Sequence, residues 1–277
     1  MITGHANAIG SPRATGIILG LLEQRTGQRI DSSRSWRIET ALKPLLRDLG
    51  LASIDQLASA LGDGTSPGLS DSIVDALLNQ ETSFFRDANV LEMIADVVAR
   101  LQAEEPDRRM RVWSAGCSTG QEPLSLAMLF AEAETKGGAA APEIQASDIS
   151  AQAIERARRG TFSQFEIQRG LPVRRMVTWF DDRDGQWVAK PELMRRISFR
   201  RHNLVDQPPL PGRFDLILCR NVLLYFAAPV RQRVLASLAS ALRPGGLLVL
   251  GAGETVIGQT DLLQPSVTYR GLYELSR

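Results

Sequence analysis

The residues that most clearly indicate ligand binding form a glycine-rich turn between a short apolar run and a helix-like segment. The turn reads Ser114-Ala115-Gly116-Cys117-Ser118-Thr119-Gly120. Glycines let the backbone turn sharply and approach a ligand closely, and the start of the following helix offers free N–H groups and a partial positive charge. The spacing Gly116-x-x-x-Gly120 lacks the full dinucleotide pattern Gly-x-Gly-x-x-Gly. The turn therefore predicts a nucleotide-like ligand that has no pyrophosphate.

Two carboxylates are placed where they would face a ligand at this turn. Asp148 ends the second expected strand, from which an acidic side chain accepts hydrogen bonds from both ribose hydroxyls. The same residue is also placed to cap the helix expected over 151–159. Glu122 lies in the first turn of the helix after the glycines, where the helix dipole favours it and where it would also meet the ammonium or ribose of a cofactor. The sequence leaves both interpretations of each residue open.

A polar cluster with two aromatic residues precedes the helical stretch at 90–102. It reads Asn79-Gln80-Glu81-Thr82-Ser83-Phe84-Phe85-Arg86, and its alternative role is a capped helix start with a Phe-Phe core anchor. A polar pair, Arg220-Asn221, follows the apolar run 213–219. Ligands of open α/β sheets bind beyond the carboxyl ends of the strands, so we expect this pair at the floor of a site. Tyr225 is expected at its rim, or as a core aromatic with its hydroxyl at the surface.

The thiols and imidazoles do not form a reactive set. The chain has two cysteines, Cys117 and Cys219, and two histidines, His5 and His202, without the spacing of a metal site or a disulfide framework. Cys219 ends an apolar strand and is expected to be a buried thiol. Cys117 has no apparent base, and His202 is expected to be structural. No metal is predicted.

Strands and helices alternate from residue 111 onward, which predicts a mostly parallel sheet covered on both faces. The expected strands cover 111–115, 144–147, 213–219, 247–250 and 268–275, and the expected helices cover 122–134, 151–159 and 230–242. Asp184-Gly185 between β-like runs is a hairpin signal. We therefore predict a Rossmann-like α/β domain over 103–277, with a small antiparallel β-subdomain inserted at about 172–201.

The first part of the chain has helical patterning only. One helix is expected from a cap at Asp31 or Ser32 to Leu49, kinked or split by Pro44. A further helix is expected over 54–61, capped by Ser53, and another from a cap at Ser70 or Asp71 to Leu78. These segments predict an all-α domain over 11–78, followed by a linker and connector helix over 79–102. A length of 277 residues fits one large and one smaller domain.

Composition narrows the class of protein. The formal net charge of +1 does not favour generic nucleic-acid binding, so no nucleic-acid partner is expected. No apolar run approaches the roughly 20 residues that a membrane span needs, and the start lacks the pattern of a secretory signal. We expect a cytoplasmic protein without membrane insertion.

The segments together resemble the chemotaxis receptor methyltransferase family (CheR). The motifs that carry the resemblance are Glu81-Thr82-Ser83-Phe84-Phe85-Arg86, Arg111-Val112-Trp113-Ser114-Ala115-Gly116-Cys117-Ser118-Thr119-Gly120 with Glu122-Pro123, Ala146-Ser147-Asp148-Ile149, Phe214-Asp215-Leu216-Ile217-Leu218-Cys219-Arg220-Asn221-Val222-Leu223-Leu224-Tyr225-Phe226, Leu242-Arg243-Pro244-Gly245-Gly246 and Gly253-Glu254. They occur in the family's order. The resemblance covers essentially residues 15–277.

The resemblance implies a helical N-terminal domain, an S-adenosylmethionine-binding domain and a small β-subdomain. Members of the family transfer the methyl group of S-adenosylmethionine to glutamate side chains of methyl-accepting chemotaxis receptors, leaving S-adenosylhomocysteine. The implied cofactor-binding residues are Gln80, Thr82, Arg86, Gly116, Glu122, Asp148, Asn203, Leu204, Arg220 and Asn221, and the implied catalytic residues are Arg86 and Tyr225. Among these, Thr82 and Arg86 would touch the methionine end, Asp148 the ribose and Asn203-Leu204 the adenine. Tyr225 would lie near the methyl-transfer centre.

Two residues depart from the family's pattern. Gln80 replaces a common asparagine and adds a methylene, and Gln121 replaces the first glutamate of Glu-Glu-Pro. These changes favour the alternative function, a non-catalytic cofactor- or receptor-binding module of the same fold. Receptor contact is implied for the β-subdomain, which in some members docks a C-terminal tail peptide. A basic helix face is either a second receptor contact or an ordinary solvated face; it comprises Arg34, Arg37, Lys43 and Arg47.

Overall fold

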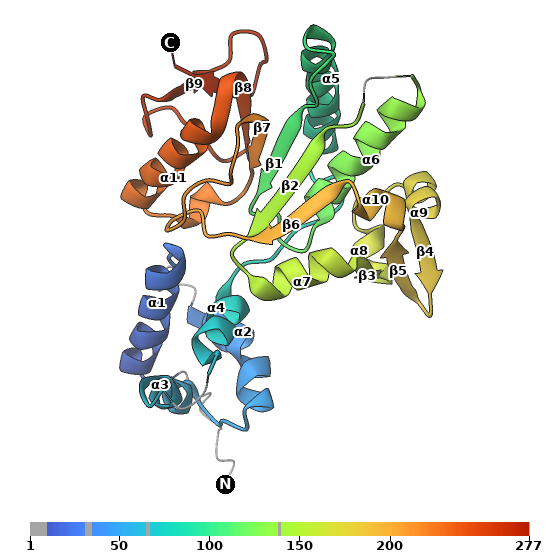
Figure 1. Ribbon diagram of the computed structural model, residues 1–277. Coiled ribbons are helices and arrows are strands. Elements are labelled where there is room, and N and C mark those ends of the chain that lie inside the picture. Colours follow the sequence, from blue (N-terminus) through green and yellow to red (C-terminus); the bar gives the residue numbers. More distant parts are fainter. Residues whose placement is uncertain (1–9, 31–34, 65–66, 138–139, 277) are drawn as a thin grey trace. The chain divides into compact units, whose positions relative to one another are not determined.

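The computed structural model describes residues 10–30, 35–64, 67–137 and 140–276. The chain divides into two compact units (Figure 1). The first comprises the chain up to Asn79 together with Tyr225–Ala227, and the second comprises Gln80–Leu224 and Ala228–Arg277. None of the helices in the described ranges combines the length and the apolarity that a bilayer crossing needs.

The first unit is built from helices around its own apolar core. Its helices are α1 (Pro12–Thr26), α2 (Ser35–Asp48), α3 (Ile54–Gly62) and α4 (Leu69–Leu77). Ser53 caps α3 by accepting a hydrogen bond from the backbone N–H of Gln56, as predicted. The helix α2 continues through Pro44, so the predicted split is wrong, because Ile38 and Leu42 stay buried in the core. The helix α4 begins at Leu69, after Gly68, so the predicted cap at Ser70 or Asp71 is wrong. The predicted cap residues Asp31 and Ser32, and Arg34, lie outside the described residues.

The second unit contains a mixed sheet of seven strands in the order β6-β2-β1-β7-β8-β10-β9. Its strands are β1 (Arg111–Ala115), β2 (Glu143–Asp148), β6 (Ile197–Arg201), β7 (Phe214–Cys219), β8 (Leu242–Leu250), β9 (Leu263–Pro265) and β10 (Tyr273–Leu275). The five strands from β6 to β8 are parallel, and β10 is antiparallel to both β8 and β9. The carboxyl ends of the parallel strands therefore form one edge, where α/β proteins bind ligands.

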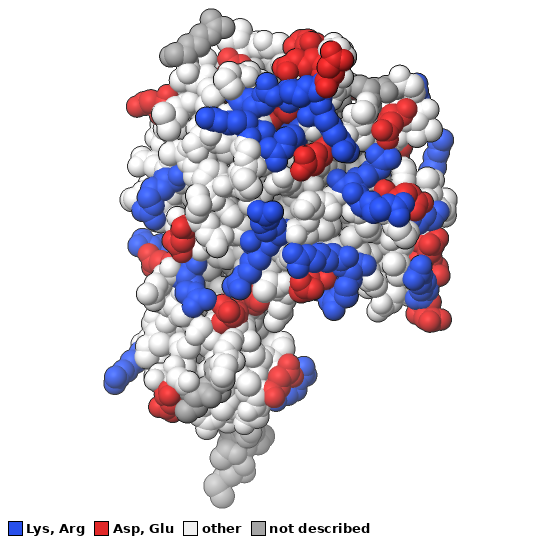
Figure 2. Space-filling view, viewed as in Figure 1, with Lys and Arg blue, Asp and Glu red and all other residues white. Residues whose placement is uncertain are grey.

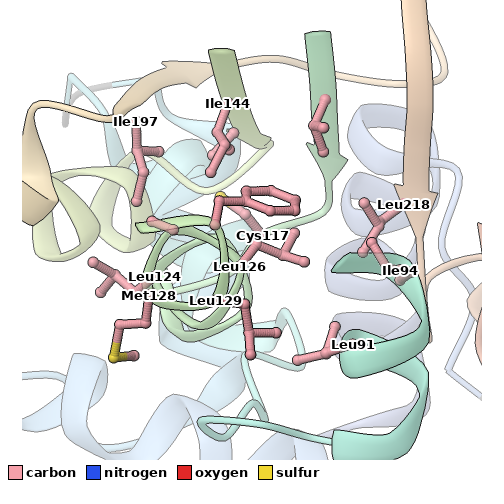
Figure 3. Close-up of a cluster of buried hydrophobic side chains, with 14 of the residues drawn as sticks. Leu91, Ile94, Cys117, Leu124, Leu126, Met128, Leu129, Ile144, Ile197 and Leu218 are labelled. Carbon is pink, nitrogen blue, oxygen red and sulfur yellow. The ribbon is translucent and has the colours of Figure 1, made fainter. Parts of the chain in front are cut away.

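Helices pack against this sheet and enclose its core. They are α5 (Ala88–Glu104), α6 (Gln121–Thr135), α7 (Ala151–Arg159) and α11 (Ala228–Ala241), and a short 3₁₀ turn, η2 (Leu223–Tyr225), follows β7. Figure 3 shows Leu91 and Ile94 of α5 beside the buried side chains of α6, under Ile144 of β2 and Leu218 of β7. Both helices therefore share one apolar core with these strands.

The β-subdomain is a three-stranded antiparallel sheet in the order β3-β5-β4. Its elements are β3 (Thr161–Ser163), α8 (Gln164–Gln168), α9 (Val173–Trp179), β4 (Phe180–Arg183), β5 (Gln186–Ala189) and α10 (Pro191–Met194). The predicted hairpin is confirmed, since β4 pairs with β5 and both Asp184 and Gly185 have a positive φ, as a two-residue turn of this type requires. Phe84 packs edge-on against Phe162 at a centroid distance of 4.9 Å and anchors the subdomain.

Three expected boundaries differ from the structure. The segment Ile197–Arg201 pairs in parallel with β2 at the edge of the main sheet, although the sequence placed it in the insertion. The strand β8 begins at Leu242, ahead of the predicted residue 247, because an irregularity in register lets Leu242 pair with Phe214. The last predicted strand is shorter and starts at Tyr273. Edge pairing and register shifts depend on distant strands, so local periodicity does not reveal them.

An ion pair and a backbone hydrogen bond connect the starts of β1 and β7. Both Nη atoms of Arg108 donate to the buried carboxylate of Asp215, at 2.9 and 2.7 Å, and the backbone N–H of Arg111 donates to it at 2.8 Å. Figure 2 shows acidic side chains interspersed among the arginines and lysines of the visible face. Asp215 thereby ties β7 to the segment that enters β1.

Candidate active site

The glycine-rich turn connects β1 to α6 at the carboxyl edge of the sheet. The backbone N–H groups of Gly116 and Cys117 both donate to the carbonyl oxygen of Ser147, at 2.8 and 2.9 Å. Gly116 has a φ of +80°, and a Cβ there would lie 2.5 Å from Cγ2 of Val222. Only glycine fits this position, because Val222 occupies the space that a Cβ would fill.

Asp148 ties the end of β2 to the glycine-rich turn. One oxygen of its carboxylate accepts the backbone N–H of Ser118 at 2.8 Å, and the other accepts that of Ser150 at 2.9 Å. The cap of α7 is Ser150, whose hydroxyl accepts the N–H of Ala153. The N-cap alternative for Asp148 is therefore wrong, because the chain needs two further residues before the helix starts.

Glu122 and Arg220 form a buried ion pair below the turn. Glu122 accepts from the hydroxyl of Ser114 at 2.7 Å and from Nη1 of Arg220 at 2.9 Å. Nη2 of Arg220 donates to the carboxylate of Asp87 and, at 3.1 Å, to the carbonyl oxygen of Arg86. The Arg220 side chain is 2% exposed. This one guanidinium joins β7, the start of α6 and the start of α5, as a planar fork of donors allows.

The polar cluster before α5 joins the same edge. Nε2 of Gln80 donates to the hydroxyl of Ser150 at 3.1 Å, and the carbonyl oxygen of Gln80 accepts from the hydroxyl of Ser118 at 2.9 Å. Thr82 is half-buried, and its side chain makes no hydrogen bond with the described residues. Phe84 and Phe85 are buried. The segment is thus both a core anchor, as its alternative role predicted, and a wall of the edge.

Arg86 is held by a carboxylate of its own motif. Its Nη1 donates to Oε2 of Glu81 at 2.9 Å and to the carbonyl oxygen of Glu81 at 3.4 Å. Arg169, which follows α8 of the β-subdomain, binds the other oxygen of Glu81. Glu81 therefore links the β-subdomain to Arg86.

Glu254 is a structural member of the site for which sequence reasoning assigned no role. Its carboxylate accepts four backbone N–H groups, those of Asn221 (2.8 Å), Val222 (2.9 Å), Leu224 (3.3 Å) and Gly251 (2.8 Å). It holds Asn221 at a φ of +59°. The only signal in the sequence was the Gly253-Glu254 motif, since the contact spans 33 residues.

The other predicted site residues lie at the margins of this network. Asn203 binds within its own loop, where Nδ2 donates to Asp206 at 2.9 Å and Oδ1 accepts the N–H of Val205 at 3.0 Å, and Leu204 is buried. Tyr225 belongs to the first unit, in which its hydroxyl accepts a hydrogen bond from the Asn79 amide. The structure thus connects Gln80 with Asp148 through Ser118 and Ser150, and Glu122 directly with Arg220. Gly116 and Asn221 are held separately, by Ser147 and by Glu254.

The two cysteines are buried and free. Burial raises the pKa values of the Cys117 and Cys219 thiols well above their ordinary value, and the carboxylate of Asp148 acts in the same direction on Cys117. A thiol with a raised pKa is a poor nucleophile at neutral pH.

His202 is buried beside the site and has a structural environment. Its Nε2 donates to the carbonyl oxygen of Pro208 at 2.8 Å, its ring packs edge-on against Trp113, and Nδ1 has no partner among the described residues. Burial lowers the pKa of His202 from its ordinary 6.5. Because the unfolded chain then binds a proton that the folded chain does not, we expect the free energy of unfolding to fall as pH drops below about 6.5.

The measurement is urea unfolding between about pH 5.5 and 7.5 for the wild type and His202→Gln. The variant is expected to lose part of the acid-side decline, because glutamine does not titrate. Identical pH slopes for the two proteins would show that His202 does not supply this dependence.

Comparison with known proteins identifies the chain's relatives. Residues 80–271 match the family described as CheR methyltransferase, SAM binding domain. The chain belongs to the CheR family. It is 34% identical to a chemotaxis protein methyltransferase of Pseudomonas putida over 90% of this chain and 94% of that protein. It is 36% identical to one from Vibrio parahaemolyticus (90% and 93%) and 32% identical to that of Escherichia coli K12 (93% and 88%).

The chain is therefore a chemotaxis protein methyltransferase that uses S-adenosylmethionine, as the sequence predicted. Its fold is the α/β fold of such enzymes with N-terminal helices and an antiparallel subdomain. The family membership favours the enzyme over the non-catalytic module. The departure at Gln121 is accommodated inside the core, where Gln121 is 2% exposed and its Oε1 accepts from the Thr119 hydroxyl at 2.8 Å.

Proposed function

We propose that this enzyme transfers the methyl group of S-adenosylmethionine to glutamate side chains of methyl-accepting chemotaxis receptors. The products are glutamyl methyl esters and S-adenosylhomocysteine. The observation that carries the proposal is the placement of Asp148 beside the glycine-rich turn, and of the Glu122–Arg220 pair, at the carboxyl edge of a sheet in a CheR-family chain. Its site of action would be the cytoplasmic helical region of the receptors.

The residues at the edge fit S-adenosylmethionine. Asp148 ends β2 at the carboxyl edge of the sheet, where an acidic side chain is suited to accept hydrogen bonds from two ribose hydroxyls. Gly116 gives the turn beside Asp148 its positive φ and leaves room for Val222. In this arrangement Gln80, Thr82 and Glu122 line the methionine side, while Asn203 and Leu204 flank the adenine. Arg220 and Asn221 close the pocket.

The acceptor chemistry needs no general base. A glutamate side chain has an ordinary pKa of about 4.3 and is already an anion at neutral pH. The cofactor, when bound, supplies a methyl group activated by its sulfonium. The task of the protein is to align the carboxylate with that methyl group and to exclude water, and good alignment contributes roughly 7–11 kcal/mol. This fits an edge in which both thiols and His202 have structural surroundings.

Arg86 is suited to orient a carboxylate in this step. Glu81 holds one Nη atom of its guanidinium, and the remaining N–H groups stay available for a bidentate contact. We assign Arg86 to bind a carboxylate at the methyl-transfer centre, either that of the cofactor's methionine end or that of the acceptor glutamate. Tyr225 is assigned to the same centre from its position in the family motif.

Receptor recognition is assigned to two surfaces. One is the exposed part of α2, where Lys43 and Arg47 are exposed and Arg37 is half-buried, which would complement acidic receptor helices. The other is the β-subdomain, which we propose as the binding site of a receptor tail peptide. Each surface belongs to a different unit of the chain.

A transfer assay tests the proposed function. Purified protein, radiolabelled S-adenosylmethionine and each cognate receptor are expected to give receptor-bound label that mild base releases, because carboxyl methyl esters hydrolyse readily. The matched control is a receptor whose candidate glutamates are changed to alanine. S-adenosylhomocysteine binding with no labelling of any cognate receptor would contradict the proposal, and base-stable label would indicate a different acceptor.

Tyr225→Phe is expected to lower kcat by about tenfold and to change the Kd of S-adenosylhomocysteine by less than about twofold. The variant removes only the hydroxyl, which in the wild type is hydrogen-bonded to Asn79, and keeps the ring. Steady-state transfer rates and calorimetry measure the two effects. Tyr269→Phe is the matched control, and an unchanged kcat for Tyr225→Phe would return Tyr225 to a structural role.

A further inference from the structure

A cavity of about 710 Å³ opens in the second unit beside Arg220. It lies between the start of α5, the ends of β7 and β8, and the start of β10. Because β10 runs antiparallel to β8, its first residues arrive at the edge where β8 ends. That topology brings Arg270, three positions before Tyr273, to the same cavity as Arg220 and Gly251.

Arg270 is the charged group of this cavity that has no internal partner. Asp87 and Arg220 bind each other, and Glu254 accepts four backbone N–H groups. Arg270 is exposed and makes no hydrogen bond or ion pair with any residue that the structure describes. The positive charge of Arg220 is already offset by Glu122 and Asp87. The cavity therefore presents one guanidinium whose donors are available to a ligand.

The cavity shares a wall with the cofactor residues. Arg220 lines it and also donates to Glu122, which stands at the start of α6 directly after the glycine-rich turn. A ligand in the cavity would therefore contact Arg220, which is also bonded to Glu122. The volume far exceeds that of one glutamate side chain, so it accommodates several neighbouring side chains of a polypeptide.

We propose that this cavity is a receptor subsite, in which Arg270 binds a carboxylate of the acidic segment that carries the acceptor glutamate. A guanidinium is suited to this role because it recognises carboxylates through two parallel hydrogen bonds. Arg270 is then a specificity-determining residue that selects acidic receptor segments. The inference rests on the proposed receptor methylation.

The test uses the full-length enzyme and a chemotaxis receptor that the wild type methylates. Arg270→Ala is expected to raise the KM for the receptor about tenfold, to change kcat by less than about twofold and to leave S-adenosylhomocysteine affinity unchanged. The KM for the receptor is expected to rise less in Arg270→Lys than in Arg270→Ala, and to rise more in Arg270→Glu. The difference between wild type and Arg270→Ala should shrink at high salt, which a merely structural role would not cause.

Arg100→Ala is the matched control, since Arg100 is an exposed arginine on the same unit far along α5. A receptor KM for Arg270→Ala equal to that of wild type would overturn the subsite while leaving the proposed function intact. Equal losses in receptor and S-adenosylhomocysteine affinity would place Arg270 on the cofactor side and would also overturn it. A wild type that methylates no receptor would overturn the proposed function and the subsite together.

Discussion

Arg220→Met is expected to lower the free energy of unfolding by about 3–5 kcal/mol and to abolish methyl transfer. The Arg220 side chain is almost fully buried and neutralises Glu122 and Asp87. Methionine fills much of the volume but leaves the Glu122 carboxylate, which is 15% exposed, without its cation. Removal of one partner from a buried pair costs more than the pair contributes, because the remaining charge is desolvated. Urea unfolding and the transfer assay measure the two losses.

Two further variants separate charge from geometry at this position. Arg220→Lys keeps the charge but has a single ammonium, which cannot bridge Glu122, Asp87 and the carbonyl oxygen of Arg86 as the guanidinium does. We expect an intermediate loss of stability. The double variant Arg220→Met/Glu122→Gln should be more stable than Arg220→Met alone, because it leaves no buried anion unpaired. Wild-type stability of Arg220→Met alone would refute the assignment of Arg220 as the central tie.

Asp148→Ala is expected to weaken binding of S-adenosylmethionine by about 100-fold or more. Hydrogen bonds to a charged group contribute about 1.5–3 kcal/mol each, so loss of two ribose contacts corresponds to at least about two powers of ten in Kd. The variant also removes the acceptor for the N–H groups of Ser118 and Ser150, which loosens the turn itself. Calorimetry with S-adenosylhomocysteine measures the change in affinity.

Asp148→Asn is the matched control for this prediction. It keeps the shape and one acceptor oxygen but replaces the other by a donor, which conflicts with one of the two backbone N–H groups. We expect a smaller loss of affinity than for alanine, with the fold retained in thermal unfolding. Binding by Asp148→Ala within about twofold of wild type would remove Asp148 from the cofactor site.

The two predictions concern separate parts of one edge. Asp148 acts through Ser118 of the turn and Ser150, the cap of α7, which also bind Gln80. Arg220 acts through Glu122 and the start of α5. We therefore expect the Asp148 variants to lose mainly cofactor affinity. We expect the Arg220 variants to lose both cofactor affinity and stability.

The sequence by itself determined the features that rest on local chemistry. The alternation of strands and helices, the glycine-rich turn, the hairpin at Asp184-Gly185 and the Ser53 cap follow from periodicity and from the backbone angles that particular residues permit. The position of Asp148 at the end of a strand and of Arg220-Asn221 after another was also readable. The family motifs supplied the reaction and the cofactor, because their order along the chain is specific.

Only the tertiary structure decided how these residues are bound. The partners of Arg220 lie 98 and 133 residues away in the chain, and Ile197–Arg201 joined the main sheet because β2 offered it an edge. Ser150 rather than Asp148 capped α7, which freed Asp148 to hold the turn. Glu254 lies after the end of β8, where it binds the backbone of Asn221. Arg270 lies before the start of β10, which is antiparallel to β8, and therefore lines the cavity beside Arg220. Such contacts join positions that no local pattern relates, so packing alone selects them.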